Sequence, residues 1–264
     1  MALSPRRRRR YSRAAQYVVF VLLVAAIAAK ANWGQLHNQF LQADLAGQLF
    51  PEIITVALRN TVVYTVAGFA FGLVVGVVVA LMRLSSVTPY RWAATLYIEL
   101  FRGLPALIVF ILIGVAVPLA FPGFEVPGGT TGKVALALGL VAAAYMAETI
   151  RAGIQAVPRG QLEAARSLGF SHGGALRSIV IPQAFRIVIP PMANEFVLLF
   201  KDSSLVLFLG VTLSERELTA FGRNLASQTA NSTPILVSGL CYLLLTVPLG
   251  YSARWLERRG ARSR

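Results

Sequence analysis

Long stretches without charged residues dominate this sequence and restrict what it can fold into. The clearest is residues 61–82, which contain no Asp, Glu, Lys or Arg. An α-helix needs about 20 mainly apolar residues to cross the hydrocarbon core of a membrane. Only 14% of the 264 residues are charged, and the mean hydropathy is +0.65, which argues against a water-soluble enzyme and excludes a disordered basic protein. The sequence therefore predicts an all-α, polytopic membrane protein.

Six segments are predicted to span the membrane. They are residues 14–31, 61–82, 104–121, 134–147, 187–200 and 234–253. The fifth contains Pro190, Pro191 and Glu195 and meets the polar run 201–204 before apolar residues resume, which predicts a helix that is interrupted inside the membrane. In the second, Gly68, Gly72 and Gly76 share one face, which predicts close packing against another helix.

The distribution of basic residues predicts the orientation. Nineteen Lys and Arg residues fall in segments 1–13, 83–102, 151–186 and 254–264, whereas five fall in segments 30–52, 122–133 and 201–233. Cytoplasmic loops carry the excess of basic residues, so both basic termini, 1–13 and 254–264, are expected in the cytoplasm. The arginine run 6–10 directly precedes an apolar segment, which favours an orientation signal over nucleic-acid binding.

The first apolar segment has two interpretations. Its basic start, short apolar stretch and small residues at 26–31 are also typical of a cleaved signal peptide. We favour an uncleaved anchor helix over residues 14–31. Cleavage would leave the topology of the other five helices unchanged.

The sequence offers no set of residues for catalysis or cofactor binding. It has one cysteine and two distant histidines, and no nucleophile with a nearby base. The segment 128–133 differs from a phosphate-binding loop, because its spacing is one residue short and Val134 follows the lysine. We therefore expect no cofactor in this chain, so that any ATP and Mg²⁺ are held by a partner.

The inner loop between the fourth and fifth spans has its own helix signals. Pro158 suits a helix start, Gly169 suits a helix end, and Ser171 can cap a second short helix that ends at Pro182. Two short helices would form a knob on the cytoplasmic side, with Ala164 and Ala165 as a bare contact surface. An interfacial helix lying on lipid headgroups is the alternative, and periodicity does not decide between them.

The residues of this loop resemble the EAA motif of ABC importer permeases. Glu163-Ala164-Ala165 is followed at the family spacing by Gly169 and then by Ile179-Val180-Ile181-Pro182, with Ile181 in place of leucine. The resemblance implies that residues 155–185 form a coupling loop that docks into a cytoplasmic ATPase subunit. The residues that carry this role would be Glu163, Ala164, Ala165, Gly169, Ile179 and Pro182.

Further motifs resemble the polar amino acid permeases of the histidine, glutamine and glutamate type. They are the FRGLP element at 101–105, the segment 145–154, and the segment 182–191 followed by KDSSL at 201–205. The resemblance implies a five-helix permease core within 53–253, preceded by one extra transmembrane helix. It also implies an extracytoplasmic amino-acid-binding protein, a second permease copy or paralogue, and a bacterial inner membrane. The substrate would be a polar amino acid: glutamine or glutamate is preferred, and histidine and arginine remain open.

Polar residues within the spans are candidate substrate contacts. Glu195 and Asp202 lie seven residues apart, hence on one helical face, and could accept the ammonium group of an amino acid. Lys201 and Ser203 could bind its carboxylate, and Asn60 and Thr61 are weaker candidates. Arg102 could also reach the carboxylate, although its i,i+3 spacing from Glu99 favours a structural pair. A Lys201 ion pair that only locks the helices is the alternative. Glu148 and Arg151, spaced i,i+3, are expected to pair with each other.

Three other functions remain open at this stage. An ion-coupled secondary transporter would show inverted repeats, which the sequence lacks. An intramembrane enzyme would need a nucleophile and a base. An ABC importer of another solute, such as a sulfonate or phosphonate, would share the EAA motif, but the elements at 101–105 and 201–205 argue against it.

Overall fold

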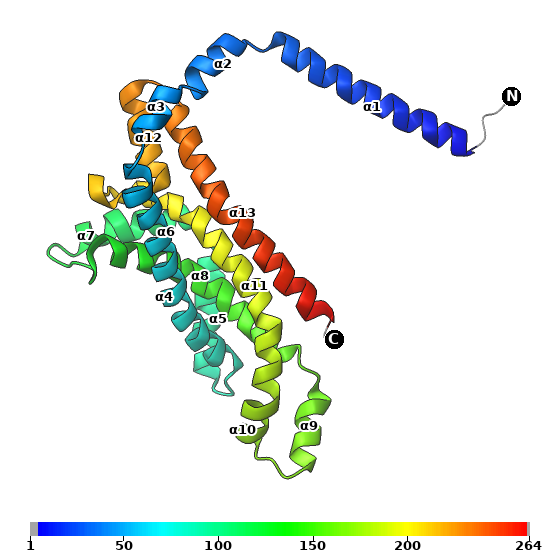
Figure 1. The fold of residues 1–264 in the computed structure, drawn as a ribbon. Coiled ribbons are helices and arrows are strands. Elements are labelled where there is room, and N and C mark those ends of the chain that lie inside the picture. The colour runs from blue at the N-terminus through cyan, green and yellow to red at the C-terminus, as the bar shows by residue number, and fades with distance from the viewer. Residues whose placement is uncertain (1–4, 263–264) are drawn as a thin grey trace.

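The computed structural model describes residues 5–262, with side chains for residues 12–259, and within that range every regular element is a helix (Figure 1). The all-α prediction is confirmed. The extreme ends of the two predicted basic termini, residues 1–4 and 263–264, lie outside the described residues. The long helices are α1 (Pro5–Lys30), α4 (Arg59–Leu84), α8 (Gly129–Gln155), α11 (Ile181–Asp202) and α13 (Thr233–Arg262).

Within the part of the chain that the structure describes, four helical segments are long and apolar enough to cross a membrane by themselves. They are Ser12–Lys30, Ile53–Leu84, Gly129–Gln155 and Thr233–Arg259, and they contain or closely match the first, second, fourth and sixth predicted spans. The second starts earlier than predicted because a π-helical segment, η1 (Ile53–Leu58), continues directly into α4.

The third predicted span, 104–121, coincides with the helical stretch Ala106–Ala120, which is long enough to cross a membrane only as part of a bent pair with the helix before it. Helix α5 (Thr88–Gly103) and the helical stretch Ala106–Ala120, which comprises α6 (Ala106–Ile111), η2 (Leu112–Ala116) and α7 (Val117–Ala120), meet at an angle of 103°. Pro105 has no N–H to donate and restricts the preceding Leu104 to an extended conformation (φ −89°, ψ 136°), so the helix must break there.

Helix α5 falls within a segment that was predicted to be a cytoplasmic connection. Its Ala94 and Ile98 are instead buried in a cluster with Val79 and Ala80 of α4 and Ala147 of α8. The hydroxyl of Tyr97 donates to the carbonyl of Leu140 at 2.7 Å. Small side chains on α4, α5 and α8 allow this close packing, which brings the end of α5 into the helical bundle.

The fifth span is interrupted at the predicted polar run 201–204, where α11 ends at Asp202, but the interruption predicted at the prolines is wrong. Helix α11 continues through Pro190 and Pro191, and Pro182 lies in its first turn instead of ending a separate helix. The short α10 (His172–Ala175) and the π-helical η3 (Leu176–Val180) run into it without a gap, so residues 172–202 form one helix. Local π turns and burial among neighbouring helices make proline tolerable inside such a helix. The change comes later, at the 3₁₀ segment η4 (Ser203–Leu209).

The packing of α4 against α8 forms the centre of the bundle. A Cβ atom added at Gly68 would lie 2.7 Å from the Cβ of Leu138, and one added at Gly72 would lie 3.1 Å from the carbonyl oxygen of Gly139. The glycine face predicted from the sequence therefore packs within the chain. Without a hydrophobic driving force between helices in lipid, such close approach is a main source of stability.

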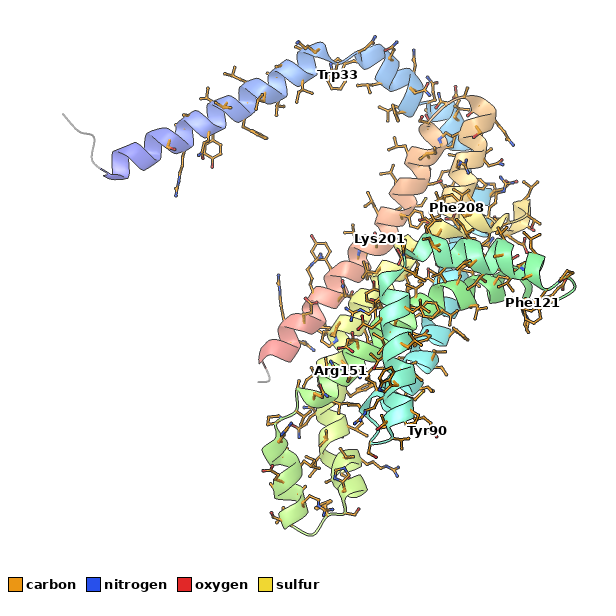
Figure 2. The ribbon with its side chains drawn as sticks, turned by 180° about the vertical axis from the view of Figure 1, so that it is seen from behind. Trp33, Tyr90, Phe121, Arg151, Lys201 and Phe208 are labelled. Carbon is orange, nitrogen blue, oxygen red and sulfur yellow. The ribbon has the colours of Figure 1, made fainter. Side chains whose placement is uncertain are left out.

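The two ends of the bundle carry different elements (Figure 1). At one end lie α9 (Arg159–Ser167) and α10. At the other lie α2 (Trp33–Phe40), α3 (Ala43–Gln48), η5 (Leu213–Glu215) and α12 (Leu218–Thr229). Helix α1 extends away from the bundle, and its apolar window contains no buried residue (Figures 1 and 2).

Candidate functional site

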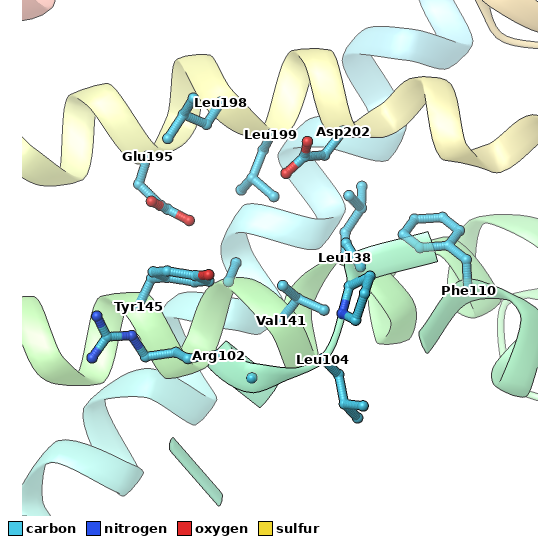
Figure 3. A pocket seen from close by; sticks show the side chains of 14 residues that line it. Arg102, Leu104, Phe110, Leu138, Val141, Tyr145, Glu195, Leu198, Leu199 and Asp202 are labelled. Carbon is cyan, nitrogen blue, oxygen red and sulfur yellow. The ribbon is translucent and has the colours of Figure 1, made fainter. Parts of the chain in front are cut away.

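A cavity of about 480 Å³ lies where the bend of the third span faces α8 and α11 (Figure 3). Glu195 and Asp202 line it from α11, and Arg102 lines it from the end of α5. Figure 3 shows the two carboxyl side chains projecting from α11 into the space that Tyr145 and Arg102 border from the other side. The remaining wall is mainly apolar, with Leu138, Val141 and Leu199 among its members. Three of the predicted substrate residues are thus brought together.

The break at Pro105 explains why a guanidinium reaches this cavity. Because α5 ends at Gly103, Arg102 lies at the end of a helix that has already entered the bundle. Its guanidinium carbon is 5.3 Å from the centre of the Tyr145 ring, a cation–π distance. Tyr145 was not among the predicted substrate residues, although it begins the motif at 145–154 and lies one helical turn before Glu148.

Two other predicted substrate residues, Lys201 and Ser203, do not line the cavity. Lys201 is exposed (Figure 2). Among the side chains of residues 12–259 the sole ion pair joins Glu148 and Arg151, so the alternative of a Lys201 salt bridge is not found there. Ser203 is fully buried and donates to the carbonyl of Phe200 at 2.7 Å. Its hydroxyl stabilises the transition from α11 to η4.

Asn60 and Thr61 contact a different segment, at the end of the bundle that carries α12. The amide of Asn60 donates to the carbonyls of Ser214 and Arg216, at 2.8 and 3.1 Å. The buried Thr61 hydroxyl accepts from the Leu218 N–H at 3.2 Å. One turn along α4, the Tyr64 hydroxyl donates to the Glu215 carbonyl at 2.8 Å. These side chains satisfy backbone groups of residues 214–218, which lack partners within a helix.

The coupling loop has the local structure that its sequence predicts. Gly169 ends α9 with a positive φ of 85°, which favours glycine, and the Ser171 side chain caps the next helix by accepting from the Gly174 N–H at 3.1 Å. Glu163 and Ala164 are exposed. Ala165, by contrast, is 1% exposed, so the prediction that it contributes to a bare contact surface is wrong.

The orientation of α9 accounts for this difference. Leu162 packs against a buried cluster of Val157, Val180 and Ala184, which turns one face of α9 toward the helix that continues into α11. Leu168, one turn after Ala164, is 80% exposed. A helical period alone does not fix which face of α9 the neighbouring helix covers. Of the other predicted coupling residues, Ile179 is partly buried and Pro182 is exposed.

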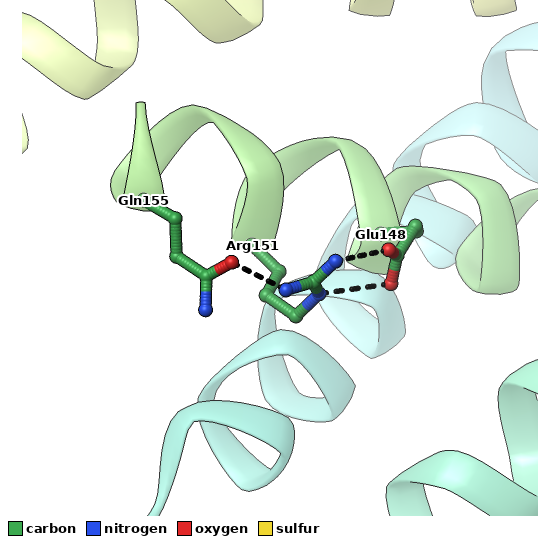
Figure 4. A network of polar contacts seen from close by, with 3 residues as sticks. All are labelled: Glu148, Arg151 and Gln155. Atoms are coloured by element: carbon green, nitrogen blue, oxygen red, sulfur yellow. Dashed lines mark hydrogen bonds and ion pairs between the residues drawn. The ribbon is translucent and has the colours of Figure 1, made fainter. Parts of the chain in front are cut away.

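The predicted pair of Glu148 and Arg151 is confirmed (Figure 4). The Arg151 guanidinium makes two hydrogen bonds to the Glu148 carboxylate, and it also donates to the side-chain oxygen of Gln155. All three residues lie in the last turns of α8, next to the start of the coupling loop. The pair reinforces that helix end.

Comparison with known proteins identifies the family. The sequence profile of the family described as the inner membrane component of binding-protein-dependent transport systems matches residues 72–262. The chain belongs to this family. The matched region includes the cavity, α9 and α11, and it begins within α4. Family membership together with the apolar helices makes this a multi-pass membrane protein.

Individual relatives agree with the family assignment. The probable glutamine ABC transporter permease protein GlnM of Bacillus subtilis is 38% identical over 201 residues, covering 76% of this chain and 89% of the relative. The arginine transport system permease protein ArgU of Corynebacterium glutamicum is 34% identical over 251 residues, covering 91% and 78%. A crystal structure of an amino acid ABC transporter with histidines is 32% identical, with a TM-score of 0.73, covering 83% and 99%.

A more distant structure shows the fold alone. An inward-facing conformation of the MetNI methionine ABC transporter matches with a TM-score of 0.61 at 18% identity. The fold of this chain is therefore shared with a protein of much lower sequence similarity.

Proposed function

We propose that this chain is the transmembrane permease subunit of an ABC importer that carries a polar amino acid into the cytoplasm. One observation supports this most directly. A single helix, residues 172–202, starts in the coupling loop and ends at the cavity with Glu195 and Asp202. At 1.5 Å per residue it is about 45 Å long, so a movement of the loop is transmitted to the cavity as movement of a rigid element.

The polar groups of the cavity match the two ends of an amino acid. The Arg102 guanidinium suits the α-carboxylate, because arginine and carboxylate form charge-assisted hydrogen bonds. Glu195 or Asp202 suits the α-ammonium group. Apolar neighbours such as Leu138 and Leu199 exclude water and strengthen these interactions. In this proposal Tyr145 holds the Arg102 guanidinium in place beneath the substrate.

The charges of the cavity also bear on the choice of amino acid. One carboxyl group is left over after the α-ammonium group is bound, and Lys201 lies outside the cavity. The remaining acceptor suits a side chain that donates hydrogen bonds, whereas a substrate carboxylate would add a third acidic group. Of the two substrates expected from sequence, this favours glutamine over glutamate.

The energy source and the assembly lie outside this chain. In the proposal, Glu163 and Ala164 contact ATPase subunits that hold ATP and Mg²⁺, and their closure moves α9 and, through it, α11. A second permease copy or paralogue completes the pathway, and an extracytoplasmic binding protein delivers the amino acid. The complex lies in the bacterial inner membrane with both termini of this chain in the cytoplasm. Nucleic acid has no part in it.

The proposal is tested by uptake and ATP hydrolysis in proteoliposomes that contain the permease, its ATPase subunits and the binding protein. Glu163→Arg reverses the charge on the exposed face of α9 and should abolish both uptake and stimulated hydrolysis. Gln161→Arg is the matched control, because it introduces the same side chain at another exposed position of α9 and should retain most of the activity.

Two results would contradict the proposal. Amino acid uptake that persists without any ATPase subunit would identify an ion-coupled carrier and refute the proposal. Competition by glutamine, glutamate, arginine and a sulfonate in the same vesicles ranks the substrate classes. Inhibition by the sulfonate alone would contradict the amino acid assignment.

A further inference from the structure

A second, smaller cavity lies at the end of the bundle opposite the coupling loop. Its volume is about 200 Å³, and it is formed between the end of η4 and the helix α12. Leu207, Gly210 and Val211 make one wall, and Arg216 and Arg223 contribute positive charge to the other. Sites for small-molecule ligands usually enclose about 300–1,000 Å³, so this one is the size of a side chain.

Neither arginine has an acidic partner among the described side chains. Among the side chains of residues 12–259 the one ion pair joins Glu148 and Arg151, at the other end of the bundle. Arg216 is nevertheless held in place, because its Nε donates to the Leu213 carbonyl at 3.2 Å and its guanidinium carbon lies 5.9 Å from the centre of the Phe221 ring. Arg223 is exposed on α12.

The acidic residues nearest in sequence are both occupied elsewhere. The Glu215 carboxylate accepts from the Thr212 hydroxyl and N–H, at 2.6 and 3.0 Å. The Glu217 carboxylate is fully buried and accepts from two N–H groups of α12 and from the Tyr242 hydroxyl, each at 2.6 Å. The segment thus contains two acidic and two basic residues, but only the basic ones lie at the cavity.

We infer that the Arg216–Arg223 cavity is the docking point for a carboxylate side chain on the surface of the extracytoplasmic binding protein. The inference rests on the proposed function, which supplies that partner. Charge complementarity selects an acidic group, and the cavity lies at the end of the bundle remote from the ATPase-contacting α9. Arg216 provides a fixed donor, and Arg223 provides an exposed charge that attracts the partner from solution.

The position of η4 gives this docking a consequence for transport. Asp202, which lines the substrate cavity, directly precedes η4, and Gly210, which lines the docking cavity, directly follows it. The seven residues of η4 span about 14 Å at the 3₁₀ rise of 2.0 Å per residue. Leu209 packs against Gly114 of the Ala106–Ala120 stretch, since a Cβ atom added there would lie 2.3 Å from its Cδ2. A partner bound at Gly210 therefore acts on the same short element that ends at the substrate cavity.

The inference is tested by titrating the binding protein against uptake in the complete proteoliposome system. Arg223→Glu should raise the binding-protein concentration for half-maximal uptake by about tenfold or more, since a rim charge acts mainly on association. The matched control is Arg59→Glu, because Arg59 is an exposed basic residue of α4 that lies outside the cavity. This variant should leave the half-maximal concentration unchanged. An unchanged titration for Arg223→Glu overturns the inference.

A second variant covers the case in which charge reversal disrupts folding. Arg223→Lys places a primary amine at the cavity, and a carbodiimide should couple it to an Asp or Glu of the bound partner, as located by mass spectrometry. Arg59→Lys should give no such product. Absence of a product at position 223 refutes the docking site. Wild-type uptake that needs no ATPase refutes the proposed function instead, so the two failures are distinguishable.

Discussion

The Tyr242 hydroxyl donates a hydrogen bond to the Glu217 carboxylate at 2.6 Å and thereby joins α13 to the start of α12. The same carboxylate caps α12 by accepting from the N–H groups of Thr219 and Ala220, both at 2.6 Å. Glu217 is fully buried, so each of these donors compensates for the loss of water around its carboxyl group. This network holds one wall of the docking cavity in place.

Tyr242→Phe should therefore destabilise the protein. Removing the hydroxyl leaves the buried carboxylate short of one donor, at a cost of about 1–3 kcal/mol. The measurement is thermal unfolding in detergent. Tyr251→Phe is the control, because that tyrosine is 66% exposed and should lose no measurable stability. Equal unfolding temperatures for wild type and Tyr242→Phe would show that the bond contributes nothing.

Gly68→Ala should weaken the contact between α4 and α8. The new Cβ would approach the Cβ of Leu138 to 2.7 Å, which forces the helices apart, and overpacking of this kind costs about 1–3 kcal/mol. Gly239→Ala on α13 is the same substitution with no atom within 4 Å, so it should stabilise by up to about 1 kcal/mol through helix propensity. The two unfolding temperatures should shift in opposite directions, and a shift in the same direction contradicts the packing.

Glu215 should make stability depend on pH in the acidic range. Hydrogen bonds from the Thr212 hydroxyl are the main cause that lowers the pKa of Glu215 below its ordinary value of 4.5. A carboxyl group with a lowered pKa in the folded state stabilises the protein above its unfolded-state pKa, and this contribution is lost as the pH falls through the folded-state pKa. The difference in unfolding temperature between wild type and Glu215→Gln should shrink as the pH is lowered from 7 to 3. A constant difference would contradict this origin.

Arg102→Gln should raise the KM for amino acid uptake. Losing a charged hydrogen bond to the substrate carboxylate costs about 1.5–3 kcal/mol, which corresponds to roughly 10- to 150-fold in affinity. Arg91→Gln on the same helix is a matched control outside the cavity and should leave KM unchanged. If Arg102→Gln lowers only the maximal rate and not KM, the guanidinium does not bind the substrate.

Several parts of the coupling loop were predictable because they depend on neighbouring residues only. Gly169 ends a helix because its backbone conformation is strained for other residues, and Ser171 caps the next helix with its own side chain. The ionic pair of Glu148 and Arg151 likewise follows from a spacing of one helical turn. None of these features requires knowledge of a second helix.

The effect of proline was predicted less well. Pro105 breaks the third span, whereas Pro190 lies buried within a continuous helix. Both lack an N–H group, and the difference lies in their surroundings. A neighbouring helix can stabilise the backbone around one proline and not the other, which sequence does not reveal.

The sequence by itself determined the membrane-spanning character, the positive-inside expectation and the motifs of the coupling loop, because these are properties of local composition and spacing. Only the tertiary structure decided which side chains meet. Arg102 lines the same cavity as Glu195 and Asp202 because α5 ends inside the bundle, and Asn60 instead contacts the segment after η4. Helical periodicity assigns a residue to a face, but the partner of that face is selected by how the helices pack.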